Sequence, residues 1–455
     1  MKALSAQSYI RPTVKRGMGG TVVSILLIAG SAYWLYHCYR ILAVGLTTLG
    51  IDTFGATWGI LVANTVHIIG ISHVGIAISA VVRILRLDQY RSIARIAEFI
   101  TLIALATAVI NLLLHVGRPD RFILNVFLYG KWHSPMVWSM TVFVLYFLTS
   151  SVYLYLSMRR DLWTMTRLAT KSRGLYQFLA FGYQDTEGER ARHKRVLFWL
   201  ALALIPIMIS VHSVYGLLFG MISAKAGWYN PLQAPYFVLG AIVSGFSTIL
   251  AVAALLRRVY SWQHLLTDRL FRVFGIFLTF MVFLYLYFML SEHLTAQYLP
   301  TVADGAISDS LLSGRFSGVF WMTTIVGLIM PFGYLFVQSV KRGYVNIGLT
   351  ATAAVLINVA LWLKRYFLVV PPQYQPYLQT ARPLTEYIPT HTEWVVTLGS
   401  YVAAALVFLF LIKLFPTIEL PVGSDTVAYQ KTVDHSSARK TVMVISLVAG
   451  FLMII

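Results

Sequence analysis

The segments WGILVANTVHIIGISHVGIAISAVV, residues 58–82, and FITLIALATAVINLLLHV, residues 99–116, decide the fold. Each is an almost unbroken apolar run, close to the roughly 20 residues that an α-helix needs to cross a bilayer. A turn rich in arginine joins them, and the charged stretch HVGRPDR, residues 115–121, follows the second. We interpret this part of the chain as two membrane-spanning helices that carry ionisable groups at membrane depth, which marks a functional site by default.

Apolar runs of similar length recur along the whole chain, and charged residues make up only 12% of the 455, against about 25% in a soluble domain. The strands of a β-barrel would show short alternating segments instead. We therefore predict an all-α fold, a polytopic transmembrane helix bundle of about ten spans, arranged as two four-helix bundles plus peripheral helices. The predicted spans are 21–40, 58–82, 99–116, 136–157, 196–220, 235–256, 272–292, 318–339, 345–363 and 395–415.

This arrangement divides the chain into four parts. Residues 1–57 hold the N-terminal tail and first span, and residues 58–220 hold the first bundle, spans two to five, with the candidate site. Residues 221–370 hold the second bundle, spans six to nine, and residues 371–455 hold a Pro-rich outer loop, the last main span and an apolar tail. The tail from Thr441 to Ile455 is short for a crossing, so an interfacial helix and a thin eleventh span are both open.

The net charge of +19 is carried by loops that flank apolar spans, so we expect no nucleic-acid partner. Basic residues gather in alternate loops, which predicts a cytoplasmic N-terminus. The loop after the third span breaks this pattern, because Arg118, Arg121 and Lys131 make it basic on the outer side. It is either a surface for a partner or for lipid head groups, or a structural charge cluster on a turn.

Cys38 is the only cysteine, which excludes a disulfide within the chain and a cluster ligated by its own cysteines. A bound haem would need two axial histidines on facing helices at one depth. No span repeats a pair of histidines in the way that stacked haems require. We expect no metal and no haem in this chain.

Several histidines lie within the predicted spans. If the N-terminus is cytoplasmic, His67, His115 and His212 share one level near the outer face, and His73 lies near mid-depth. A quinol site needs a hydrogen-bond partner for the hydroxyl and a group that accepts its proton, and histidine suits both tasks. The alternative for each is a hydrogen-bonded packing residue. His67 and His73 are six residues apart and so do not share one helical face.

The carboxylates of this region also allow two interpretations. Glu98 follows Arg95 at helical spacing, so it is either a surface ion pair or a proton entry point on the cytoplasmic side. Asp120 either pairs with Arg118 or Arg121 to lock the turn, or borders the quinone pocket. We predict catalytic roles for His73 and Glu98. The predicted quinone-binding residues are His67, His73, His115, Arg118, Asp120 and His212.

Ordered motifs in the chain resemble a known family. GISHVGIAISA at 70–80, Ala97-Glu98 and Gly117-Arg118-Pro119 resemble the NrfD/PsrC family of polysulfide reductase membrane subunits. Later stretches are similar to its ten-span branch in alternative complex III. They are VHS at 211–213, PYFVLGA at 235–241, SGF at 244–246 and NVALWLKR at 358–365. Lys364 departs from the family pattern, which has an acidic residue beside the arginine.

The resemblance implies a quinone-interacting subunit of a respiratory oxidoreductase complex, in the cytoplasmic membrane of a bacterium or archaeon. It implies menaquinone or ubiquinone as the bound carrier, with no redox centre and no complete active site in this chain. Electrons would be exchanged with an iron–sulfur subunit on the outer face. A multihaem cytochrome and other membrane subunits would be further partners, beside membrane lipid, and protons would cross through the subunit.

Two other functions fit the composition. A secondary transporter also places polar groups at mid-depth, but it typically has Gly/Pro-broken spans in corresponding positions of two halves, and no such pair is evident. A purely structural membrane anchor for extrinsic subunits would have no quinone site. Uptake of a substrate into liposomes by this chain alone would favour the transporter. A complex that quinone-site inhibitors do not affect would favour the anchor.

Overall fold

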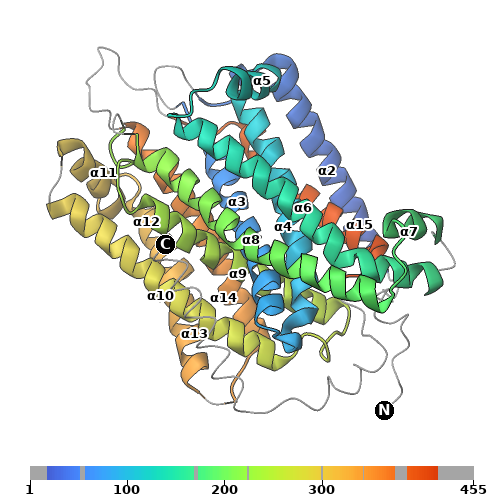
Figure 1. Ribbon diagram of the computed structural model, residues 1–455. Coiled ribbons are helices and arrows are strands. Elements are labelled where there is room, and N and C mark those ends of the chain that lie inside the picture. The colour runs from blue at the N-terminus through green and yellow to red at the C-terminus, as the bar shows by residue number, and fades with distance from the viewer. Residues whose placement is uncertain are drawn as a thin grey trace.

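The computed structural model describes residues 18–51, 57–168, 173–222, 225–298, 301–341, 343–374 and 387–418. Within these ranges the chain is helical and forms no β-strand (Figure 1). Ten helices are long and apolar enough to cross a membrane, which confirms the prediction of a polytopic all-α bundle of about ten spans. The tail from Thr441 to Ile455 lies outside the described residues, as does most of the Pro-rich loop.

The spanning helices are α2 (Met18–Val44), α3 (Ile60–Ile84), α4 (Arg91–Val116), α6 (Pro135–Leu168), α8 (Glu187–Gly220), α9 (Gln233–Val259), α10 (Asp268–Tyr298), the sequence α12 (Ser317–Thr324), η3 (Ile325–Ile329) and α13 (Met330–Val340), then α14 (Ile347–Val369) and α15 (His391–Leu414). The short elements are η1 (Leu46–Thr48), η2 (Asp88–Tyr90), α5 (Pro119–Tyr129), α7 (Arg173–Ala180), α11 (Val302–Leu312) and η4 (Pro371–Tyr374). Several helices run past the predicted spans, because charged residues with good helix propensity continue a helix beyond its apolar run.

Helix α3 lies at the centre of the bundle. It packs against α4, α8, α9 and α14, and it is buried on all sides, as expected for a helix that is apolar all round. Helix α9 contacts α8, α10 and α14, whereas α2 and α15 pack on each other at the periphery (Figure 1). These contacts suit two bundles joined along α3 and α9, but that division remains a prediction.

Two glycines let α3 approach its neighbours closely. A Cβ on Gly75 of α3 would lie 2.0 Å from the carbonyl oxygen of Ala97 in α4. A Cβ on Gly245 of α9 would lie 2.5 Å from the Cβ of Val74 in α3. Since neither contact is possible for a larger residue, small side chains set the helix separation here, as is common in membrane proteins.

Candidate functional site

The shortest polar contact between α3 and α8 joins two histidines. Nδ1 of His73 lies 2.7 Å from Nδ1 of His212, and the two rings meet edge to face. His73 is 1% exposed, and His212 is also buried. His73 is the fourteenth residue of α3, about 20 Å along the helix axis from its first residue. The pair is therefore deep within the bundle.

Both nitrogens of His212 face carbonyl oxygens of the backbone. Nε2 of His212 lies 3.1 Å from the carbonyl oxygen of Ile69, and Nδ1 lies 3.2 Å from that of Met208. Because Nδ1 of His212 also faces His73, either ring can donate in the contact between the two Nδ1 atoms. Nε2 of His73 makes no hydrogen bond with any residue that the structure describes. The arrangement leaves this one ring nitrogen of the pair open to a further partner.

His67 has a different partner on α14. Its Nε2 lies 3.1 Å from Oδ1 of Asn358. The amide nitrogen of Asn358 donates to the carbonyl oxygen of Ser244 and to the hydroxyls of Ser247 and Thr248, all on α9. Because that nitrogen must donate, Oδ1 faces His67 and accepts from it. His67 and His73 thus point to different partners, as their six-residue spacing predicts.

Asn358 was not among the predicted site residues, and neither was Arg365 on the same helix. Arg365 is buried, and its guanidinium lies over the ring of Phe237 at 4.2 Å. A Cβ on Gly240 would lie 2.5 Å from its Nη2, so this glycine makes room for it. Arg365 forms no ion pair or hydrogen bond within the described part of the chain.

The neighbouring Lys364 contacts the end of α10. Its Nζ lies 3.7 Å from Oε2 of Glu292, and Lys364 itself is buried. Glu292 and Lys364 face each other inside the chain, which offsets the charge of a lysine at a position where the resemblance leads us to expect an acid.

Glu98 lies in a separate cluster of charges between α3, α4 and α6. It is fully buried, and it accepts hydrogen bonds from the hydroxyls of Ser79 and Ser157. Arg83 and Arg95 each approach it to 3.8 Å. The expected pair with Arg95 is present, but the expectation of a surface position was wrong. Helix α4 begins at Arg91, eight residues before the predicted span, so Glu98 lies two turns inside it.

Asp161 of α6 completes this charge cluster. It accepts a hydrogen bond of 2.8 Å from Arg95, which also donates to Ser157. Two arginines and two carboxylates give the cluster no net charge, which is how a membrane helix can bury them. The hydroxyl of Tyr153 lies 2.9 Å from that of Ser79 and joins this network.

The remaining candidates lie where α3 begins and α4 ends. His115 is half-buried and meets the ring of Trp58 edge to face. Arg118 and Asp120 form an ion pair of 2.9 Å at the surface, each 61% exposed. The structure therefore brings His73 and His212 together but separates both from His115, Arg118 and Asp120. His212 contacts Ile69, two residues from His67 on α3, whereas His115 meets Trp58 before α3 begins, so His115 does not share the level of His67 and His212.

Two cavities in the described part of the chain lie away from these histidines. One cavity lies under α5 and the other beside α7, and neither is lined by His67, His73 or His212. Across the described ranges, no three histidine, cysteine or acidic side chains gather as a metal site would require. The histidine pair offers acid–base chemistry and hydrogen bonding.

Comparisons with known proteins agree with this picture. The chain is 29% identical over 402 residues to a Halobacterium salinarum protein provisionally named as a membrane subunit of dimethyl sulfoxide reductase, covering 87% of this chain and 86% of the other. It is 26% identical to a selenate reductase subunit of Mesobacillus selenatarsenatis, covering 87% and 93%. It is 24% identical to the Hdr-like menaquinol oxidoreductase integral membrane subunit of Archaeoglobus fulgidus, covering 79% and 85%. The family described as "Polysulphide reductase, NrfD" matches residues 52–376. Its match over most of the ten-span bundle establishes that this chain belongs to the NrfD family of multi-pass membrane proteins.

Proposed function

We propose that this chain is the quinone-interacting subunit of a respiratory oxidoreductase complex, exchanging electrons with an extrinsic iron–sulfur subunit on the outer face. The observation that carries the proposal is the free Nε2 of His73, held by His212 in the centre of a membrane-spanning bundle. Two relatives are named as menaquinol oxidoreductase and menaquinone reductase membrane subunits, which supports a quinone as the carrier.

Quinol oxidation releases two electrons and two protons, so the site must accept protons as the electrons leave. In the proposed tautomer, His73 carries its hydrogen on Nδ1 and donates it to His212, so Nε2 of His73 accepts a hydrogen bond from the quinol hydroxyl and takes its proton there. The imidazolium that forms keeps its hydrogen bond from Nδ1 to His212, which is stronger once His73 is charged. For quinone reduction the same nitrogen gives the proton back. His73 is then the group that touches the carrier, and His212 positions it.

Two further groups support a bound head group. His67, held by Asn358, offers a second imidazole on α3. Arg365 contributes a buried positive charge on α14, the helix that carries Asn358, and such a charge favours a carrier that is losing a proton. The histidine pair is packed between helices, so entry of a head group requires the side chains around α3 and α8 to move apart. The exposed Arg118–Asp120 pair is not needed for this step.

We further propose that protons reach or leave this site through Glu98, with the N-terminus in the cytoplasm. Ser79 lies six residues beyond His73 on α3, about 9 Å along the axis, and it donates to Glu98. Between them, the hydroxyls of Thr101 and Tyr146 both donate to the carbonyl oxygen of Ser72. These polar groups support a route along one side of α3. The alternation of basic loops supports the orientation.

The test is quinol oxidation by the intact purified complex with a short-chain menaquinol. His73→Gln keeps the size and polarity of the side chain but cannot accept the proton, so turnover should fall about 100-fold or more. His264→Gln, in the exposed turn before α10, is the matched control and should leave turnover unchanged. All three preparations should contain the same set of subunits. Wild-type turnover in the His73 variant would contradict the proposal.

A further inference from the structure

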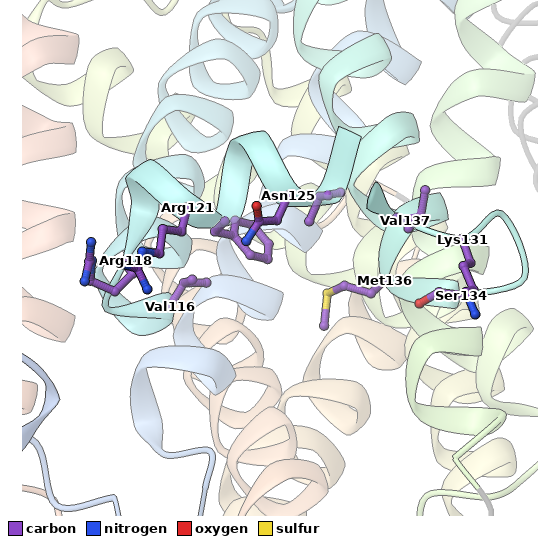
Figure 2. A pocket seen from close by; sticks show the side chains of 11 residues that line it. Val116, Arg118, Arg121, Asn125, Lys131, Ser134, Met136 and Val137 are labelled. Atoms are coloured by element: carbon purple, nitrogen blue, oxygen red, sulfur yellow. The ribbon is translucent and has the colours of Figure 1, made fainter. Parts of the chain in front are cut away.

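The first observation is the cavity under α5, which lies apart from the histidines. It has a volume of about 420 Å³, is open to the outside, and is bordered by α5, the end of α4 and the start of α6 (Figure 2). Helix α4 ends at Val116 and α6 begins at Pro135, so the cavity lies where two membrane spans end. That level corresponds to the head groups of the lipid bilayer.

The second observation is the charge of the cavity wall. Arg118 is neutralised by Asp120, whose pKa is lowered to about 2 by the hydrogen bond from Arg118. Arg121 and Lys131 also line the cavity, and neither forms an ion pair with any residue that the structure describes. The wall is therefore left with two uncompensated positive charges. Such a wall is complementary to an anion.

The third observation is the apolar character around these charges. Phe122, Val126 and Met136 also line the cavity, and Figure 2 shows Met136 between Arg121 and Lys131. On the outside, Leu128 is 68% exposed, Tyr129 78% and Trp132 68%. Aromatic side chains at this level are typical of a helix that lies in the membrane interface. If this surface faced water, the apolar area of these side chains would stay exposed to it.

From these observations we propose that the cavity under α5 binds the head group of an anionic phospholipid, attracted by the charges of Arg121 and Lys131 at its two ends. Charge alone would suit an acidic patch of a partner protein equally well. The apolar lining and the exposed aromatic rim favour a molecule that is anionic at one end and apolar at the other. A cavity of this volume also admits a single head group more readily than a protein surface.

The test is the thermal stability of the full chain in detergent, with phosphatidylglycerol, phosphatidylcholine or inorganic phosphate added. Phosphatidylglycerol should raise the melting temperature by about 3 °C or more over phosphatidylcholine, and inorganic phosphate should not. The double variant Arg121→Gln/Lys131→Gln should lose this difference and retain less phosphatidylglycerol in native mass spectrometry. The matched control, Arg192→Gln/Lys194→Gln, removes two exposed cations from the start of α8 and should keep it.

Three outcomes would overturn the proposal. The first is a phosphatidylglycerol effect that survives in the Arg121/Lys131 double variant. The second is an equal effect of inorganic phosphate, which would make the cavity a site for the free ion. The third is a double variant that keeps the lipid effect but no longer co-purifies with another subunit, which would make the surface a protein-docking face.

Discussion

His73 of α3 and His212 of α8 are joined through their Nδ1 atoms at 2.7 Å, although 139 residues separate them in sequence. The contact is asymmetric, because His212 has its other nitrogen occupied by the carbonyl oxygen of Ile69 and His73 does not. In the proposed mechanism, His73 is therefore the residue that can meet a substrate, and His212 is the residue that orients His73.

The first prediction concerns the orienting role of His212. His212→Leu removes the acceptor for the Nδ1 hydrogen of His73 and should lower kcat for quinol oxidation about tenfold or more. His212→Gln can still accept from His73 and donate to Ile69, so it should restore most of kcat. Steady-state kinetics of the complex decides this. Equal activity of the two variants would mean that His212 acts only by filling space.

The second prediction concerns Asn358, which links α14 to both α3 and α9. Asn358→Leu removes the partner of His67 and three donated hydrogen bonds. The free energy of unfolding should fall by about 1–3 kcal/mol, and the KM for quinol should rise. Detergent-unfolding titrations and steady-state kinetics measure the two effects.

The control for Asn358 lies on the same helix. Asn346 caps the first turn of α14 by accepting from the amide of Leu349. Asn346→Ala should cost about 1 kcal/mol of stability and leave the KM unchanged. A KM that rises equally in both variants would show that the effect of Asn358 comes from loss of stability alone.

The sequence predicts the spans well because length and hydropathy decide them. All ten predicted segments coincide with helices that can cross a membrane. The ends differ most at α6, which continues to Leu168, eleven residues past the predicted end. At α4 and α8, Arg91 and Glu187 begin helices eight and nine residues before the apolar run starts. A hydropathy profile scores each charged residue separately. It therefore does not show that Arg95 is paired with Glu98 and Asp161 inside the bundle.

The candidate site is predicted less completely. His73 and His212 were both singled out, because a histidine within an apolar run is conspicuous. Their contact was not predicted, since it depends on how α3 and α8 cross. Asn358 and Arg365 belong to a stretch that carries the family resemblance, but nothing in the sequence alone shows that they approach His67. Partners on distant helices require the packing arrangement, which periodicity does not provide.

The third prediction separates proton conduction from structural support at Glu98. Glu98→Gln and Asp161→Asn each remove one carboxylate from the same buried cluster, so each should cost about 3–5 kcal/mol of stability. Only Glu98→Gln should abolish proton transfer coupled to quinol turnover in proteoliposomes, because only Glu98 is hydrogen-bonded to Ser79 on the side toward His73. Proton uptake followed with a pH-sensitive dye measures this. Equal coupling in the two variants would assign Glu98 a structural role.

The fourth prediction concerns Asp185, which ties α6 to α8 outside the spans. Its Oδ1 accepts from Tyr183 at 3.0 Å and from Arg160 at 3.1 Å, and pairs with Arg190 at 3.0 Å. Burial tends to raise the pKa of Asp185, but the hydrogen bond from Tyr183 and the charges of Arg160 and Arg190 outweigh it and hold the pKa below its ordinary value of 3.8. The ionised form is therefore the one that the fold stabilises.

The sign of the pH dependence follows from that lowered pKa. The stability contributed by Asp185 is fully present above its ordinary pKa of 3.8 and is lost as the pH falls through the lower value in the folded chain. Asp185→Asn should therefore lower the melting temperature at about pH 7 and have a smaller effect at about pH 3. Asparagine tolerates the positive φ of 55° at this position, so the backbone is not a confounding factor. Asp88→Asn, in an exposed pair with Arg91, should change the melting temperature little at either pH. An Asp185 effect that does not depend on pH would mean that its ion pairs do not hold α6 and α8 together.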